Sequence, residues 1–182
     1  MMRAASPARK AVAYGALFPV GVGYYAGLVA GRTARPLFAQ VALWGVPAAD
    51  VRALGSTYAS EVIPQTIRPM ALEQLAWHRR NGDKIVVVSG SLAVYVRPWC
   101  EREGLERIAT ELEERNGQCT GRYLGGECTG LEKAVRIRKA YDLSRFQHIY
   151  AYGDTAEDLE MLALARHQIY RWQGASELRS AG

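Results

Sequence analysis

The spacing of hydrophobic positions divides the chain into two parts. Residues 6–70 carry apolar side chains at helical spacing, with breaks near Pro19, Gly31, Gly45–Pro47 and Pro64, and they show no strand-like alternation. After residue 70, short apolar or alternating runs take turns with helical stretches. The pattern predicts an all-helical N-terminal segment followed by an α/β fold, in which a parallel sheet has helices on both faces.

Turn residues bound the elements of the second part. Asn81–Gly82 ends the first helix, and Asn116–Gly117 is a strong signal for a two-residue hairpin turn. The predicted helices cover Met70–Arg80, a stretch around Pro98 that ends near Gly104, Thr129–Tyr141 and Thr155–Ala165. The predicted strands cover Lys84–Val88, Ile108–Glu114, Gln118–Leu124, Gln147–Tyr152 and Gln168–Trp172.

Basic residues are concentrated near the N-terminal end. The net charge is +5, and residues 1–70 hold seven Lys or Arg against Asp50 and Glu61, while the remainder is neutral. This segment suits an anionic partner, such as a phosphorylated substrate, anionic lipid or nucleic acid, or else it is an ordinary solvated surface. Three scattered cysteines without a CxxC pair indicate neither a disulfide framework nor a zinc site, and they favour a reducing, cytoplasmic setting.

An uncharged segment, residues 11–31, lies between Arg9–Lys10 and Arg32. Its length and its flanks resemble a membrane span or the apolar region of a signal peptide. Its richness in Ala and Gly, the central Pro19 and the cationic residues at both ends are also consistent with a buried helical hairpin. Membrane contact through this segment therefore stays an open alternative.

In open α/β sheets, ligands bind beyond the carboxyl ends of the strands, and two predicted strand ends carry unusual residues. Ser89 follows the strand Lys84–Val88, and Gly90 lets the backbone approach a ligand closely. Backbone N–H groups at the start of the next helix could bind an anion there. The alternative is that Ser91 merely caps that helix.

The second strand end has the sequence YGDTAEDLEML. Asp154 ends the strand, and Asp158 lies four residues later in the first helical turn. Two carboxylates at such a position can hold Mg²⁺, which keeps several waters and takes few protein ligands. Alternatively, Thr155 and Asp158 form a capping box, which accounts for Asp158 but leaves Asp154 unexplained.

Lys133, in CTGLEKAVRIRKA, lies one turn into a predicted helix and opposes the helix dipole unless an anion compensates it; the alternative is an ordinary surface lysine. In order and spacing, the strand-end serine, this lysine and Gly-Asp-x-x-x-Asp resemble the second, third and fourth motifs of the haloacid dehalogenase superfamily. The surrounding VVVSGSLAVYVRPW, GLEKAVRI and IYAYGDTAEDLEMLALA resemble its phosphoserine-phosphatase-like branch. The resemblance extends over nearly the whole chain.

This resemblance implies a Mg²⁺-dependent phosphatase acting on a small phosphorylated substrate rather than on nucleic acid. Residues 71–182 would form a Rossmann-like core, and residues 1–70 an all-helical cap. In this family an aspartate attacks the phosphorus, and water then hydrolyses the aspartyl-phosphate.

The resemblance also implies a role for each motif residue. Ser89, with Gly90 beside it, would donate a hydrogen bond to a phosphoryl oxygen. Lys133 would neutralise the charge of the phosphate and the nucleophile. Asp154 would bind Mg²⁺, with Asp158 as a second ligand or as an orienting group.

The first motif of the family is missing from the sequence. Asp-x-Asp followed by Gly and Thr or Ser supplies the nucleophile and the general acid on the central strand, and no aspartate of this chain stands in that pattern. The aspartates are Asp50, Asp83, Asp142, Asp154 and Asp158. We therefore expect a truncated, inactive chain without the first, central strand, and a gap between the strands Lys84–Val88 and Gln147–Tyr152.

Two other functions stay open at this point. The first is a non-catalytic module that binds phosphate or a partner. The second is a lipid-directed phosphatase seated at a membrane through residues 11–31.

Overall fold

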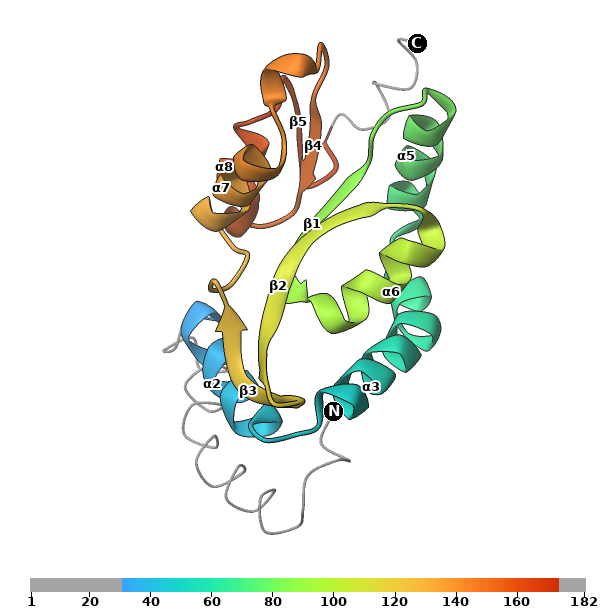
Figure 1. Ribbon diagram of the computed structural model, residues 1–182. Coiled ribbons are helices and arrows are strands. Elements are labelled where there is room, and N and C mark those ends of the chain that lie inside the picture. The colour runs from blue at the N-terminus through green and yellow to red at the C-terminus, as the bar shows by residue number, and fades with distance from the viewer. Residues whose placement is uncertain (1–30, 174–182) are drawn as a thin grey trace. The chain divides into compact units, whose positions relative to one another are not determined.

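The computed structural model describes residues 31–173, with side chains from residue 35 onward (Figure 1). The proposed membrane-contact segment, residues 11–31, thus lies outside the described part except for the backbone of Gly31. Within residues 31–173, none of the helices combines the length and the apolar character that crossing a membrane requires.

The described chain forms two compact units that are interleaved along the sequence. The first unit comprises residues up to 63 together with 92–99 and 110–127, and the second comprises 64–91, 100–109 and the residues from 128 onward. The assignment of residues 1–70 to a cap and of 71–182 to a core stays a prediction.

Helices and strands occur in both units (Figure 1). The α-helices are α2 (Gly31–Leu43), α3 (Ala48–Glu61), α4 (Ile63–Thr66), α5 (Pro69–Arg80), α6 (Ala93–Glu103), α7 (Leu131–Ala140) and α8 (Leu159–Leu162). The strands are β1 (Val86–Leu92), β2 (Glu106–Arg115), β3 (Gln118–Leu124), β4 (Tyr150–Gly153) and β5 (His167–Tyr170). Two short 3-10 helices, η2 (Leu143–Arg145) and η3 (Ala156–Asp158), complete the described elements.

The strands form two small sheets, so the predicted α/β class is confirmed but the single parallel sheet is not. One sheet has the order β1-β2-β3, and the other pairs β4 with β5. β4 and β5 are parallel, with Tyr150 opposite His167, whereas β2 and β3 are antiparallel. β1 and β4 belong to different sheets, and the gap expected between them from a missing central strand stays a prediction.

The predicted hairpin is confirmed with its turn. Asn116 and Gly117 have φ angles of 50° and 75°, both positive, as a two-residue turn that matches the twist of its strands requires. The pair Arg115 and Gln118 closes the ladder on either side of the turn.

The first unit is held together by a small apolar core between α2, α3 and the hairpin. Its buried members are Ala39, Leu43, Val46, Ala48, Val51, Leu112 and Cys119. The loop between α2 and α3 pairs with β3, because Gly45 N–H donates to the Cys119 carbonyl at 2.7 Å and Cys119 N–H donates to the Val46 carbonyl at 2.9 Å. At Gly121, a Cβ atom would lie 2.5 Å from the Cα of Gln40, so α2 and β3 approach more closely than a side chain allows.

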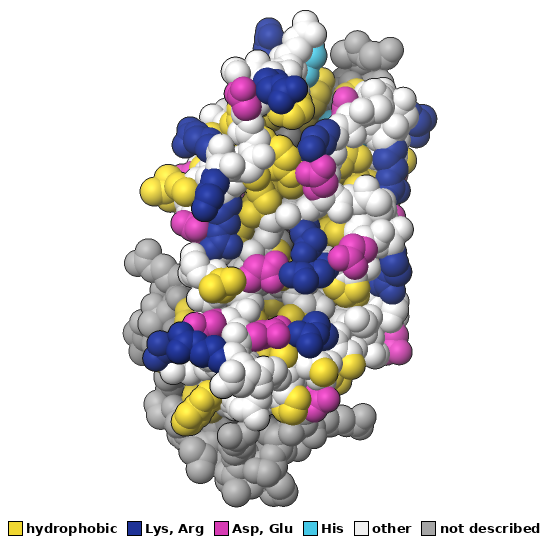
Figure 2. All heavy atoms as spheres, in the orientation of Figure 1, with side chains coloured by type: hydrophobic (Ala, Val, Ile, Leu, Met, Phe, Trp, Pro, Cys, Tyr) yellow, Lys and Arg dark blue, Asp and Glu magenta, His cyan; other side chains and the backbone are white. Residues whose placement is uncertain are grey.

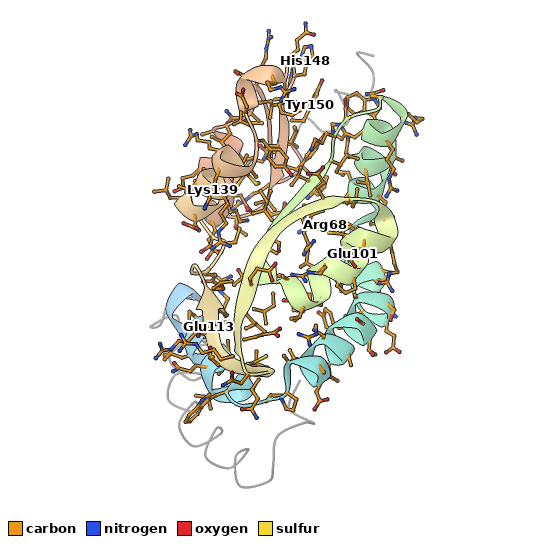
Figure 3. All side chains as sticks on the ribbon, viewed as in Figure 1. Arg68, Glu101, Glu113, Lys139, His148 and Tyr150 are labelled. Atoms are coloured by element: carbon orange, nitrogen blue, oxygen red, sulfur yellow. The ribbon has the colours of Figure 1, made fainter. Side chains whose placement is uncertain are left out.

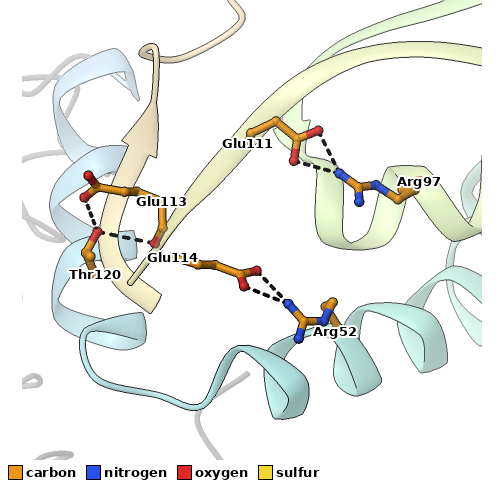
Figure 4. Close-up of polar contacts among 6 residues, drawn as sticks. All are labelled: Arg52, Arg97, Glu111, Glu113, Glu114 and Thr120. Carbon is orange, nitrogen blue, oxygen red and sulfur yellow. Dashed lines mark hydrogen bonds and ion pairs between the residues drawn. The ribbon is translucent and has the colours of Figure 1, made fainter. Parts of the chain in front are cut away.

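Charged groups of the first unit pair across its surface (Figure 4). Arg52 of α3 contacts Glu114 at 2.8 Å, and Arg97 of α6 contacts Glu111 at 3.0 Å. Such exposed pairs contribute at most about 1 kcal/mol each. On the face shown in Figure 2, basic and acidic side chains are intermingled.

Only part of the basic surface expected for residues 1–70 can be placed. The side chains of Arg3, Arg9, Lys10 and Arg32 lie outside the described residues. The other three each pair with a carboxylate: Arg35 with Glu127, Arg52 with Glu114, and Arg68 with Asp154.

In the second unit, α7 and α8 lie beside the β4–β5 sheet (Figure 1). Buried apolar residues at this contact are Ala134, Met161, Leu162, Ala165 and Ile169. The helix predicted over Thr155–Ala165 is shorter than expected, since it consists of the 3-10 turn η3 followed by α8.

All three cysteines are buried and none forms a disulfide, with Cys119 in the first unit and Cys100 and Cys128 in the second. Burial raises the pKa of the Cys100 thiol to about 11, and it also raises the pKa of Cys119.

Candidate functional site

The start of α7 places Lys133 in the interior of the second unit. Gly130 precedes the helix with a φ of 52°, and its N–H donates to the Glu157 carbonyl at 3.0 Å. Lys133 follows in the first turn and is only 6% exposed. Its Nζ donates a short hydrogen bond to Oδ1 of Asp158. The alternative of an ordinary surface lysine is therefore wrong.

Asp158 uses both of its carboxylate oxygens. Oδ2 accepts hydrogen bonds from the backbone N–H groups of Asp154 and Thr155, each at 3.0 Å, and from Thr155 Oγ1 at 2.9 Å. The capping box predicted from Thr155 and Asp158 is thus confirmed. Oδ1, in addition, forms the ion pair with Lys133. Asp158 is therefore both a helix cap and the partner of a buried cation.

The surroundings of Asp158 keep it ionised. Burial acts to raise the pKa of Asp158, but the hydrogen bonds from Lys133 and Thr155 outweigh that effect and hold its pKa below the ordinary value for an aspartate. Gly153 allows this arrangement, since a Cβ at that position would lie 2.5 Å from the Cβ of Asp158.

Asp154 is fixed through its backbone, whereas its side chain reaches solvent. The N–H of Asp154 donates to Asp158, and its carboxylate is 38% exposed. Oδ2 of Asp154 lies 3.0 Å from Nη1 of Arg68, a residue just before α5 (Figure 3). In the sequence, Arg68 is only one of the basic residues of the N-terminal segment, since a pair 86 positions apart leaves no local signal.

Ser89 differs from its predicted position. β1 runs through Ser89 and Gly90 to Leu92 instead of ending at Val88, because the extended backbone continues through the Ser-Gly-Ser sequence. Oγ of Ser89 accepts a hydrogen bond from the Ser91 N–H at 3.1 Å. Within the described residues, no side-chain hydrogen bond joins Ser89 to the lysine and the two aspartates.

The described residues contain no preformed metal site with three or more protein ligands. Between residues 31 and 173, no group of three or more His, Cys, Asp or Glu side chains is placed to hold a metal ion. Mg²⁺, however, binds through one or two carboxylates and several waters. Asp154 fits that requirement, since its exposed carboxylate already pairs with the guanidinium of Arg68. The oxygens of Asp158, by contrast, are occupied by hydrogen-bond donors.

Comparison with known proteins gives a consistent set of relatives. The family model described as haloacid dehalogenase-like hydrolase matches residues 2–163. Protein CicA of Caulobacter vibrioides is 31% identical over 131 residues, which are 71% of this chain and 59% of CicA. A probable phosphatase of Mycobacterium tuberculosis is 30% identical over 128 residues, which are 68% of this chain and 43% of that protein. The chain thus spans less than two thirds of either relative.

Solved structures show a similar fold. A Bordetella pertussis protein of unknown function has a TM-score of 0.72 at 22% identity, covering 98% of this chain and 82% of that one. A probable phosphoserine phosphatase from Vibrio cholerae has a TM-score of 0.63 at 20% identity, covering 89% of this chain and 52% of that one. At these identities the likeness concerns the fold alone.

Proposed function

Because this chain belongs to the haloacid dehalogenase-like hydrolase family, we propose that it forms the phosphate- and metal-binding part of a Mg²⁺-dependent phosphatase. The reaction would proceed through an aspartyl-phosphate on a small phosphorylated substrate. One observation carries the proposal: the buried Lys133 is paired with Asp158, whose other oxygen holds the backbone of Asp154.

The buried lysine is the first support for this function. An ammonium taken out of water is costly even when it is paired, so the pair with Asp158 is not explained by stability alone. A fixed positive charge beside the aspartates that follow β4 is what phosphoryl transfer needs, because its catalysis rests on positioning and charge stabilisation. Lys133 would neutralise the phosphoryl group there.

Asp154 would hold Mg²⁺, and Asp158 would orient it. Asp154 presents an exposed carboxylate on a backbone that Asp158 fixes by a hydrogen bond. Its present partner, Arg68, is exposed, and such a pair is worth at most about 1 kcal/mol. A divalent ion can therefore replace the guanidinium. When bound, the metal would neutralise developing charge on the phosphoryl group.

Ser89 and Gly90 would bind a phosphoryl oxygen, as the resemblance implies. The Ser89 hydroxyl accepts a bond from Ser91 N–H, which leaves its own O–H free to donate. The nucleophile would come from a segment carrying Asp-x-Asp, which is not among these 182 residues.

The test is a phosphatase assay on generic phosphomonoesters with Mg²⁺. We expect the 182-residue chain to show no turnover above an Asp154→Ala control, because the covalent route requires the missing nucleophile. An N-terminal extension ending in Asp-x-Asp should restore activity by several orders of magnitude. In the extended protein, Asp154→Asn should raise the Mg²⁺ concentration needed for activity.

Two outcomes would contradict the proposal. One is Mg²⁺-dependent turnover by the 182-residue chain well above the Asp154→Ala control. The other is an extended protein that stays inactive yet binds phosphate in a manner that depends on Lys133, which would favour the non-catalytic phosphate-binding module.

A further inference from the structure

Two of the three histidines of the chain meet where β4 and β5 begin. His148 is exposed and lies two residues before β4, and His167 is the first residue of β5. The strands are parallel with Tyr150 opposite His167, so both begin at the same end of the sheet. Figure 3 labels His148 and Tyr150 at this end of the second unit.

The distance between the two imidazoles is long for a hydrogen bond, and it also fits two ligands of one metal ion. Nε2 of His167 lies 3.4 Å from Nδ1 of His148. Good hydrogen bonds from N–H groups are shorter, about 2.7–3.2 Å. Two nitrogens bound to one tetrahedral Zn²⁺ at about 2.0–2.1 Å stand about 3.3–3.4 Å apart. The pair is thus spaced as two ligands of one ion.

The ring of His167 is also held in place. Tyr150 stacks on it with ring centroids 4.3 Å apart and planes inclined by 14°. Within residues 31–173, the imidazoles of His148 and His167 have no hydrogen-bond partner other than each other. A metal would therefore replace a single weak contact and would leave the stacking intact.

The third imidazole and the thiols of the chain are not accessible to compete for a metal. The remaining histidine, His78, is buried and bonded to Asp83 at 2.7 Å and to Tyr152 at 2.9 Å. The three cysteines are buried as well. In the described part of the folded chain, the two strand-start histidines are the accessible imidazole pair.

We propose that His148 and His167 form a surface site for a borderline divalent metal, Zn²⁺ in particular, with water completing the shell. Imidazole suits Zn²⁺, whereas Mg²⁺ takes oxygen ligands. The site is separate from Asp154, since the six residues from His148 span about 20 Å of extended strand. It is independent of the proposed phosphatase function.

The experiment titrates Zn²⁺ alone into the untagged, chelator-treated protein by calorimetry. Nitrogen NMR of ¹⁵N-histidine protein identifies the ligands, because only three imidazoles contribute signals. We expect Zn²⁺ to shift the ring signals of His148 and His167 and to leave those of His78 unchanged. Mg²⁺ should shift none of them.

Variants separate a two-ligand site from nonspecific binding. His148→Ala and His167→Ala should each weaken Zn²⁺ binding by at least the roughly 10- to 100-fold that loss of a supporting residue costs at metal sites. The exposed neighbour Gln147→Ala serves as the matched control and should bind like the parent. Unchanged affinity in either histidine variant, or a shift of only one imidazole, would overturn the proposal.

Discussion

Asp158 is the residue on which the candidate site depends, because it is the only described partner of the buried Lys133 ammonium. Asp158→Asn removes the negative charge while keeping the shape of the side chain. We expect a loss of about 3–5 kcal/mol in the free energy of unfolding, since a buried charge is left without its partner. Urea denaturation measures this loss.

Asp154→Asn is the matched control for that measurement. Its ion pair with Arg68 is exposed, so the substitution should change the free energy of unfolding by at most about 1 kcal/mol. Equal effects of the two substitutions would show that Lys133 does not rely on Asp158.

The same carboxylate gives stability a defined dependence on pH. The pKa of Asp158 is lower in the folded chain than its unfolded value of about 3.9. Its contribution is therefore complete above about pH 5 and is lost as the pH falls through the folded pKa. In Asp158→Asn this acid-side decline should be shallower than in the parent, whereas Asp154→Asn should retain it.

For single residues, the sequence predicted candidate site residues but not how they pair. Capping-box spacing identified Thr155 and Asp158, and the order of motifs identified Lys133 and Asp154. The pairs Lys133–Asp158 and Arg68–Asp154 join positions 25 and 86 residues apart, and these depend on how the chain packs. No periodicity along the chain encodes such contacts.

Among the elements, the contact of α2 with β3 makes the sharpest prediction. Gly121→Ala would place a Cβ 2.5 Å from the Cα of Gln40, at a φ of +77°. Gly126→Ala has a similar φ of +84° but meets nothing within 4 Å. In both variants the free energy of unfolding should fall by about 1–2 kcal/mol, because alanine is strained in left-handed backbone. In Gly121→Ala it should fall by about 1–3 kcal/mol more because of the clash.

Chemical denaturation of the two variants measures the difference directly. Should Gly121→Ala prove no less stable than Gly126→Ala, α2 would not pack on β3 as closely as described.

Local turn chemistry made some elements predictable, whereas others depended on distant partners. Asn116–Gly117 located the hairpin to within a few residues, because positive φ angles at both positions favour one turn type. The apolar run Lys84–Val88 did not reveal that β1 continues to Leu92. The arrangement in two sheets likewise follows from long-range pairing and not from any single strand.

For the molecule as a whole, the two small sheets predict low stability. Among the strands of residues 31–173, β1 is at the edge of its sheet, and β4 pairs with β5 alone. Unpaired strand edges promote association, and two-stranded sheets are marginal on their own. We expect the 182-residue chain to self-associate at rising concentration, as measured by light scattering after size exclusion.

An extension that supplies a further strand should reduce this association. A monodisperse chain with a steep, cooperative unfolding transition would contradict the expectation. The edges of β1 and of the β4–β5 sheet would then have to be covered.

The buried cysteines allow the local unfolding of each unit to be measured separately. A thiol reagent attacks the thiolate, and burial both shields these sulfurs and raises the pKa of Cys100 and Cys119. Labelling of these thiols at neutral pH therefore requires local unfolding that exposes them. Peptide mapping of the label on Cys119 follows the first unit, and label on Cys100 and Cys128 follows the second. Different labelling rates would reveal that one unit opens while the other remains folded.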